Sequence, residues 1–306
     1  MSERKSKRRM GRNEAGPTVV CFGEVLWDCL PRGLFLGGAP INGAYHLAQQ
    51  GLHVLPVTAV GADFLGDEAR RRIEAWGVDP RFVQRRTDRP TGTVSAAIDA
   101  KGVATYQIAR DVAWDRIEAP EKLKRLKTKP RAIVFGTLAL RETFNRRTLQ
   151  ALWEAWPEAL RVVDLNFRPP FDTAAVVRLV LREADVVKLN DDELGAWLGE
   201  RVKNERAMEH AARRLAAKHE LARVCVTAGA KGAGLLWDEQ WHWEPARAVE
   251  VRDTVGAGDA FLAGLLGAVL RGEEPREALQ RACRLGEWVA SQDGATPVYP
   301  ENRIPE

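Results

Sequence analysis

Residues 253–264 read DTVGAGDAFLAG, and this stretch decides how the whole chain is interpreted. Apolar residues recur at helical spacing from Phe261 to Leu270, which predicts a largely buried helix that begins near Gly256. The glycines of the stretch lack β-carbons, so backbone amides there can approach a ligand closely. Unpaired amides and the positive end of the helix dipole together favour an anion at this helix start.

Asp259 falls in the first turn of this predicted helix, beside any anion that the amides hold. A carboxylate in that position can accept a proton while the amides hold the charge of a transferring group. An acidic first-turn residue can also do no more than complement the helix dipole. The stretch therefore indicates a phosphoryl-transfer site, with a purely electrostatic role for Asp259 as the alternative.

The run D-T-x-G-A-G-D resembles the second signature of the ribokinase-like (PfkB) carbohydrate kinases. The resemblance implies that Asp259 deprotonates a sugar hydroxyl and that the amides of Gly256, Ala257 and Gly258 form an anion hole. It also implies ATP and magnesium as cofactors. The Gly37-Gly38 pair and Asn42 resemble the first signature of the same family. In that family the matching residues contact the sugar.

Length and composition describe an ordinary globular protein. The chain has 306 residues, of which 45% are hydrophobic and 29% charged, so it can bury a large core. Its apolar runs stay well below the ~20 residues that cross a bilayer, which predicts no membrane partner. The start is basic without a following apolar segment, so we do not expect a secretory signal.

The charge is concentrated at the start of the chain. Residues 1–12 hold six basic residues and one acid, while the formal net charge of the whole chain is +4, so the remainder is near neutral. We expect residues 1–17 to be a disordered basic tail. Because the rest offers no basic face, the sequence predicts no nucleic-acid partner.

The four cysteines (Cys21, Cys29, Cys225 and Cys283) are scattered without CxxC spacing. Two of them lie in apolar β-like runs, where a thiol acts as a small hydrophobe. A disulfide framework or a zinc site is not expected, and a reducing cytoplasm fits better.

A β–α rhythm runs through most of the chain. Strands are predicted over 18–23, 54–60, 132–135, 162–165, 185–189 and 223–227, with a returning strand over 235–237. Helices are predicted from Pro40 to Gly51, over 144–155 and over 204–219. Three more are predicted with one bound each: one ends near 76–77, one begins near 173 and one runs through 197. Such alternation predicts an α/β fold with a mainly parallel sheet and helices on both faces. The resemblance implies the ribokinase-like three-layer α/β/α fold, as one kinase domain over 18–302.

Residues 88–113 break this rhythm with two β-prone runs, 91–99 and 103–108, joined by a turn. A hairpin between α/β units must lie outside the parallel sheet, which suggests a flap. In the family such strands form a small β lid over the sugar site, here segments of about 26–37 and 88–113, and often a contact in a homodimer. Arg110 follows the second run and either faces the substrate or forms a solvated pair with Asp111.

Polar or glycine residues stand just past successive apolar strands. They are Asp28, Asn166 with Arg168, Asn190 with Glu193, and Gly229. Open parallel sheets bind ligands in the crevice beyond the carboxyl ends of their strands, so we expect these residues at one edge. Asp28, placed in the loop after the first strand, can bind a polyol, and an ordinary loop role is the alternative.

The run Asp164–Pro170 resembles the D-x-N-x-R-x-P run of the fructokinase branch, which implies that Asn166 and Arg168 belong to the substrate site. The Arg168 guanidinium can contact sugar hydroxyls or phosphate, or simply pair with Asp164.

The Asn190–Glu193 run resembles the family's N-x-x-E element, which organises magnesium and phosphate largely through water. It also fits a helix N-cap with an acidic first turn, and both can hold together.

Two further groups of residues rest on the resemblance alone. Thr227, Gly229 and Gly232 would line the nucleotide site, and a monovalent cation, usually potassium, would bind near Asp253, Val255, Ala290 and Gly294.

The sequence lacks a P-loop, a protein-kinase catalytic loop and a Rossmann GxGxxG, which disfavours those classes. We expect an ATP-dependent sugar kinase, with fructose phosphorylated at its 6-hydroxyl. The alternatives are a kinase for ribose, 2-keto-3-deoxygluconate or a nucleoside, and a catalytically silent sugar-binding protein. A nucleic-acid-binding protein driven by the basic tail is a third.

Overall fold

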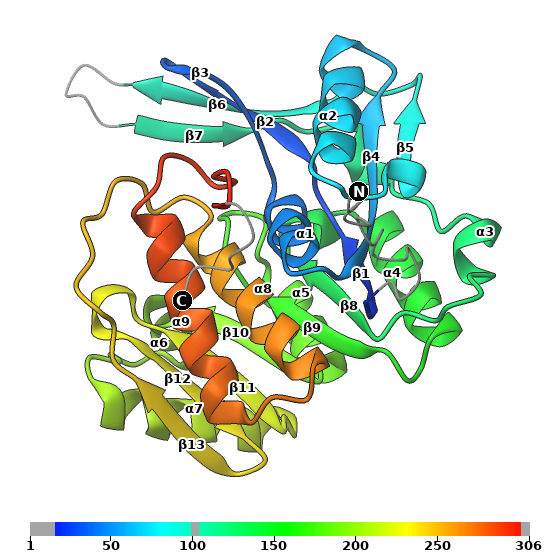
Figure 1. Cartoon of the computed structure of the whole chain (residues 1–306). Coiled ribbons are helices and arrows are strands. Elements are labelled where there is room, and N and C mark those ends of the chain that lie inside the picture. Colours follow the sequence, from blue (N-terminus) through cyan, green and yellow to red (C-terminus); the bar gives the residue numbers. More distant parts are fainter. Residues whose placement is uncertain (1–15, 99–103, 301–306) are drawn as a thin grey trace, which may run out of the picture.

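The computed structural model describes residues 16–98 and 104–300 (Figure 1). The basic tail predicted over 1–17 lies outside the described residues except for its last two. So does most of the turn predicted between the two strands of the flap. Within the two described ranges, no helix combines the length and hydrophobicity that a membrane span requires.

The central sheet has nine strands among the described residues and is mostly parallel. They are β1 (Thr18–Phe22), β4 (His53–Gly61), β5 (Val83–Arg86), β8 (Ala132–Gly136), β9 (Leu160–Asp164), β10 (Val186–Asn190), β11 (Arg223–Thr227), β12 (Ala233–Trp237) and β13 (Gln240–Glu244). The spatial order is β13-β12-β11-β10-β9-β8-β1-β4-β5, and β12 pairs antiparallel with both β11 and β13. Following the chain, β4 and β5 join the sheet on one side of β1, and β8 and all later strands join it on the other side. The switch point, where open sheets bind ligands, therefore lies between β1 and β8.

Helices cover both faces of this sheet (Figure 1). One face carries α1 (Ala39–Gln49), α2 (Phe64–Ala75), α8 (Ala257–Leu270) and α9 (Pro275–Ala290); the other carries α4 (Thr143–Ala155), α5 (Ala174–Glu183), α6 (Asp191–Leu198) and α7 (Glu205–His219). The short elements are α3 (Glu121–Lys124) and the 3-10 turns η1 (Pro80–Phe82), η2 (Ala113–Arg116), η3 (Leu138–Arg141) and η4 (Gly229–Lys231). Right-handed crossovers explain the two layers, because units that advance in opposite directions from β1 place their helices on opposite faces.

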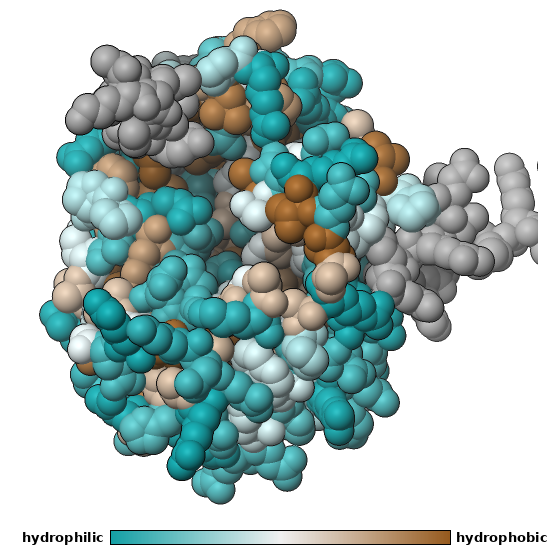
Figure 2. Space-filling view, turned by 90° about the vertical axis from the view of Figure 1, so that its left-hand side faces the viewer, coloured by the Kyte–Doolittle hydropathy of each residue, from teal (hydrophilic) through white to brown (hydrophobic). Residues whose placement is uncertain are grey.

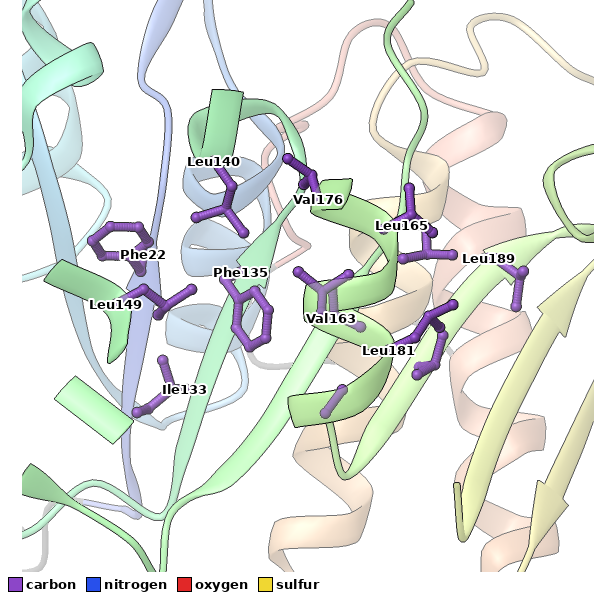
Figure 3. Close-up of a cluster of buried hydrophobic side chains, with 14 of the residues drawn as sticks. Phe22, Ile133, Phe135, Leu140, Leu149, Val163, Leu165, Val176, Leu181 and Leu189 are labelled. Atoms are coloured by element: carbon purple, nitrogen blue, oxygen red, sulfur yellow. The ribbon is translucent and has the colours of Figure 1, made fainter. Parts of the chain in front are cut away.

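The main core lies between the sheet and the layer that contains α4 and α5. Phe22, Phe135 and Val163 project from neighbouring strands and meet Leu149 of α4 and Leu181 of α5 (Figure 3). All five side chains are buried. Because both faces of the sheet are covered, its central strands are continuous apolar runs rather than alternating ones.

A second sheet projects from one end of the main sheet (Figure 1). It contains β2 (Leu26–Leu30), β3 (Gly33–Gly37), β6 (Gly92–Ile98) and β7 (Ala104–Ile108), in the order β3-β2-β6-β7. The pairs β2–β3 and β6–β7 are antiparallel hairpins, and the two hairpins join through a parallel β2–β6 pair. We call this four-stranded sheet the flap sheet.

The structure confirms the expected α/β fold, with a mainly parallel sheet between two helical layers and a small additional sheet. Asp28 lies in β2, within the lid segment expected over about 26–37, and it pairs with Phe35 and Val94, so the alternative of an ordinary loop residue does not hold. The strand forms because Leu26 and Trp27 bury their side chains directly after the turn that leaves β1. The sequence patterns did not predict β5, β13 or α9.

Candidate active site

A cavity of about 910 Å³ lies between the flap sheet and the carboxyl edge of the main sheet. Figure 2 looks onto the side where the ends of β6 and β7 project, and shows the surface hollowed there. Side chains from the ends of neighbouring strands line the cavity, including Glu24 after β1, Asp164 of β9, Lys188 of β10 and Thr227 of β11. The cavity therefore occupies the place where open parallel sheets bind ligands, and its size suits more than one small molecule.

Asp259 lies in the first turn of α8 and lines the cavity. Its Oδ2 accepts a hydrogen bond of 2.8 Å from Nδ2 of Asn42, in α1. Its enclosure by the protein, and next the nearby Asp164 carboxylate, raise the pKa of Asp259 to about 7, although Asn42, Lys188 and Arg168 act in the opposite direction. A carboxylate with a pKa near neutrality is well suited to take a proton and to release it again.

The start of α8 has no side-chain cap. Its N-cap residue, Gly256, has φ 78° and makes no side-chain cap hydrogen bond. A β-carbon at this position would lie 2.5 Å from Cβ of Ala295, so both the left-handed backbone and the close packing require glycine. The Ala257 amide donates only a long hydrogen bond of 3.3 Å to the Thr254 carbonyl, so this first turn can still offer amides to an anion beside Asp259.

Three cavity-lining residues each keep a buried oxygen without a hydrogen-bond partner among the described residues. These atoms are Oε2 of Glu24, Oδ1 of Asn42 and Oδ1 of Asp164. Burial raises the pKa of Glu24. Since buried acceptors are nearly always satisfied in folded proteins, such oxygens suit a ligand that is rich in hydroxyl groups.

Asp28 and the glycine pair form the wall that the flap sheet contributes. A β-carbon at Gly37 would lie 2.8 Å from Oδ2 of Asp28, and Gly38 adopts φ 107° with the Glu24 carbonyl oxygen 2.5 Å from its missing β-carbon. Burial raises the pKa of Asp28, and the Arg168 guanidinium partly offsets this. The glycines therefore let two backbones and one carboxylate meet at the cavity wall.

Asn166 and Arg168 also line the cavity, as the sequence predicted. Arg168 is exposed, donates to the carbonyl of Phe167 over 2.9 Å, and interacts electrostatically with Glu24, Asp28 and Asp259. The alternative, in which Arg168 pairs with Asp164, does not hold, because Asp164 accepts instead from Lys188. Arg168 is thus an exposed cation that lines the cavity beside these carboxylates.

Asn190 and Glu193 form a reciprocal cap at the start of α6. Asn190 Oδ1 accepts from the Glu193 amide over 2.8 Å, and Glu193 Oε2 accepts from the Asn190 amide over 2.9 Å. The other oxygen of Glu193 accepts from the amide of Phe167 over 2.7 Å. Burial and then Asp164 raise the pKa of Glu193. The capping alternative is therefore what the structure shows, while both residues still line the cavity.

Whether these residues can hold a magnesium ion depends on how many of its ligands the protein must supply. The described residues contain no group of three or more His, Cys, Asp or Glu side chains able to hold a metal. Magnesium keeps several waters and commonly takes its remaining ligands from substrate phosphates and one or two carboxylates. One or two such carboxylates are present at the cavity. Two amides hold Glu193 there, and Asp164 has an oxygen without a hydrogen-bond partner among the described residues, so both residues fit this role.

The residues named for a monovalent cation lie together but fit it only in part. Asp253 pairs with Arg32 over 2.8 Å and accepts from the Val255 amide over 3.0 Å. Despite burial, these partners hold the pKa of Asp253 below its usual value. The Ala290 carbonyl already accepts from two amides, those of Arg252 and Asp253. Val255 and Gly294 line the cavity.

Of the three residues expected at the nucleotide, Thr227 lines the cavity. Gly229 and Gly232 do not; they sit in the turn η4 between β11 and β12, with φ 52° and φ 125°. Lys231 in the same turn bonds Asp191 of α6 over 2.8 Å. The turn therefore borders the cavity region without lining it.

A C-terminal loop, residues 292–299, packs against both α1 and the start of α8. His46, fully buried in α1, contacts the Ala295 carbonyl through Nε2 (2.9 Å) and the Tyr299 hydroxyl through Nδ1 (2.8 Å). Tyr45 donates to the Pro297 carbonyl over 2.6 Å. Burial lowers the pKa of His46 to about 4, so the ring is neutral and donates from Nε2. The loop that presses on Gly256 is thus fixed to the helix that carries Asn42.

Arg110 departs from the expectation that it faces the substrate. It is exposed, its guanidinium lies 5.1 Å from the centroid of the Phe171 ring, and it does not line the cavity. Asp111 instead pairs with Arg89 over 3.3 Å. The chain leaves β7 before it reaches Arg110, and the side chain turns outward onto Phe171.

The sequence interpretation missed three buried charged residues of the cavity: Glu24, Asp164 as a site residue, and Lys188. Each lies in or beside an apolar strand run. That context was itself a signal, because charged residues are rarely buried unless they are paired or functional.

The fold and the cavity define a protein that binds polyols and anions beside a titratable carboxylate. The model for the pfkB family of carbohydrate kinases matches residues 19–302, and the chain belongs to this family. A fructokinase from Rhizobium leguminosarum bv. trifolii is 29% identical over 269 residues, covering 82% of this chain and 79% of the relative. A deoxyribokinase from Salmonella typhi is 27% identical over 287 residues, covering 86% and 84%.

Among solved structures, a fructokinase double mutant from Vibrio cholerae O395, bound to fructose, ADP and potassium, is similar in fold. The TM-score is 0.78 at 24% identity, over 93% of this chain and 96% of the other. The resemblance that the two signatures indicated is confirmed at the level of the family and the fold.

Proposed function

We propose that the protein transfers the γ-phosphoryl group of ATP to a sugar hydroxyl, with fructose and its 6-hydroxyl as the first candidate. The observation that carries this proposal is Asp259, which lines the large cavity at the start of α8, where no side chain caps the helix, and whose pKa is raised to about 7. A proton acceptor and an anion-binding helix start lie side by side, as phosphoryl transfer to an alcohol requires.

The reaction assigns one role to each neighbour. Asp259 takes the proton of the sugar hydroxyl, the hydroxyl oxygen forms a bond to the γ-phosphorus, and the bond from that phosphorus to the β,γ-bridging oxygen breaks, so that ADP leaves. The amides of Gly256, Ala257 and Gly258 hold the charge of the moving group. Asn42 orients the base through its hydrogen bond. Magnesium, when bound through the nucleotide near Glu193, neutralises phosphate charge.

The sugar is proposed to bind between the flap sheet and α1. Asp28, Gly37, Gly38, Asn42, Asn166 and Arg168 line that part of the cavity. Their acceptors outnumber their cations, which suits a neutral polyol better than an anionic sugar. Fructose is favoured because several similar proteins are fructokinases. Deoxyribose or another small sugar remains the rival, since a deoxyribokinase is similar to the same extent.

Several properties follow from the resemblance and stay predictions. The nucleotide is proposed to extend from the anion site toward Thr227, with magnesium as the accompanying ion. A potassium requirement is predicted near Val255 and Gly294. A homodimer through the flap sheet and a cytoplasmic location are predicted too, the latter in keeping with four free cysteines.

A sugar panel tests the function. Fructose, deoxyribose, ribose, 2-keto-3-deoxygluconate and nucleosides would each be incubated with MgATP, with and without potassium, and ADP formation measured by a coupled assay. We expect fructose to give the highest kcat/KM. Preference for another sugar would replace fructose but keep the kinase.

Sugar binding without ADP formation in any condition would favour the alternative of a silent sugar-binding protein. A chain lacking residues 1–12 serves as a control for the basic tail. We expect it to keep full activity, and loss of function would point to the tail instead.

A further inference from the structure

Lys188 is a buried cation that the steps above do not use. It lies on β10 with only 6% of its surface exposed, and its Nζ donates to Oδ2 of Asp164 over 2.7 Å. Both residues line the cavity. A buried ion pair is weak evidence for stability, because desolvation offsets most of the attraction. The position of this ion pair at the cavity therefore indicates a role for Lys188 in binding or in the reaction.

The ammonium reaches the start of α8. A β-carbon at Gly258 would lie 3.0 Å from Nζ of Lys188, so this nitrogen sits against the backbone of the anion-binding turn. An ammonium group has three donors, and Asp164 accepts from one of them. The Asp164 pair thus holds Lys188 in place while leaving donors for a ligand in the cavity.

Acidic side chains accompany Lys188 in the cavity. Asp164 pairs with its ammonium group over 2.7 Å, and Asp259 and Glu193 line the same cavity. Among the residues that the structure describes, Lys188 is a buried basic side chain that lines this cavity and lies against the backbone of Gly258. An incoming phosphate needs such a charge, because three carboxylates alone would repel it.

We propose that Lys188 is a catalytic residue that donates hydrogen bonds to the phosphoryl group in transit. The inference rests on the proposed kinase function and deepens it. Lys188 and the amides of Ala257 and Gly258 then share the γ-phosphate, while Asp164 fixes the ammonium. This role gives a further reason for a glycine at position 258, since a larger residue would push the ammonium group away from the anion hole.

The direct test compares binding of MgATP and MgADP by calorimetry in the absence of sugar. The variants are Lys188→Met and Lys188→Arg. Because Lys188 is assigned to the γ-phosphate, Lys188→Met should weaken MgATP at least tenfold more than MgADP, and kcat should fall about 10²–10³-fold, as for the loss of one donor to a developing charge. Lys188→Arg should restore part of the ATP preference.

Lys124→Met is the matched control, since Lys124 also pairs with an acid (Glu121, 3.2 Å) but lies on α3, away from the cavity. It should match wild type. If Lys188→Met fails to fold because Asp164 is left unpaired, the double variant Lys188→Met, Asp164→Asn removes both charges and is measured instead.

Equal losses for MgATP and MgADP, or a kcat within threefold of wild type, would overturn the role of Lys188. A wild-type protein that forms no ADP with any sugar would overturn the proposed function instead. The nucleotide-binding comparison still reports on Lys188 in that case, so the two failures can be told apart.

Discussion

Asp259 owes its properties to neighbours from three separate segments of the chain. Asn42 of α1 holds one oxygen, Asp164 of β9 raises the pKa, and Lys188 of β10 and Arg168 lower it. None of these groups is close to Asp259 in sequence. The site therefore exists only when the sheet and its two helical layers are assembled, and the balance of these charges sets the protonation of the base.

Replacing Asp259 by Asn tests the base directly. The amide keeps the shape and can still bond Asn42, but it cannot take a proton, so kcat should fall about 10²–10⁴-fold with little change in KM for either substrate. Steady-state kinetics with the preferred sugar measures this. Turnover close to that of wild type would remove Asp259 from the chemistry.

The same variant should change how stability depends on pH. The pKa of Asp259 is raised from an ordinary value of 3.8 to about 7, so the folded protein holds this proton more tightly than the unfolded chain. The resulting stabilisation is complete below about pH 4 and is lost as the pH rises through about 7. Asn is neutral throughout, so the melting temperature of Asp259→Asn relative to wild type should rise from pH 5 to pH 8.

Calorimetric scans of both proteins at several pH values give this difference, in which the titration of groups that do not interact with Asp259 cancels. A difference that stays constant across the range would show that Asp259 ionises normally.

At the scale of residues, sequence motifs predicted the groups that belong to short signatures. Asp259, Asn42 and Gly38 all line the cavity as expected. Lys188 and Glu24 were missed because each sits in or beside an apolar strand, where a single charged residue carries no spacing of its own. Arg110 was placed too near the substrate because a sequence cannot tell which way a side chain turns after a strand.

Among the elements, the start of α8 depends on one glycine conformation. Gly256→Ala would place a methyl group against Ala295 in a backbone conformation that costs L-residues about 1–2 kcal/mol. The turn should shift, so we expect a large loss of kcat together with a lower melting temperature.

Gly272→Ala is the matched control for this variant. Gly272 has the same φ of 78°, but nothing lies within 4 Å of its missing β-carbon. It should lose similar stability from backbone strain alone and keep its kcat. Equal kcat losses in the two variants would mean that the Gly256 contact with Ala295 does not matter for activity.

Most elements with strong periodicity were predicted within a few residues, because buried strands and amphipathic helices leave distinct patterns. The omissions have different causes. In α9, Leu279, Cys283 and Leu285 are buried on one face, a pattern that the sequence does contain. In β13 the signal is short, with two tryptophans that alternate with polar residues. The partner strand of Asp28 could not be predicted, because pairing within the flap sheet depends on β6, which is distant in sequence.

For the molecule as a whole, the flap sheet exposes an edge. β3 is its outer strand, and Leu34 and Phe35 are 49% and 37% exposed. An open apolar edge strand is a ready surface for pairing with a second copy. We therefore expect a dimer of twice 34.0 kDa by light scattering, and a monomer for Leu34→Glu.

Phe64→Glu provides the comparison, because Phe64 is 82% exposed on α2 and outside the flap sheet. It should remain dimeric. A wild-type protein that is monomeric at every concentration, or a Leu34→Glu variant that stays dimeric, would contradict an interface through this edge.

The architecture was the most predictable level. Repeated β–α units with short connections leave few topologies, because crossovers are right-handed and parallel sheets need helices on both faces. The order of strands beyond β1 and the parallel junction between the two hairpins of the flap sheet were not predictable in the same way, since both depend on pairings between distant segments.

Tyr45 and His46 hold the C-terminal loop by hydrogen bonds, and this has a consequence for a chain that a protease has shortened. A protease that cut after residue 291 would leave every strand and helix in place, yet remove Ala295 from its seat against Gly256. Such a product would lose its turnover, and its melting temperature would fall as well, because the buried His46 would lose both of its hydrogen-bond partners. The mass of the intact chain is therefore a property to check in any preparation of this protein.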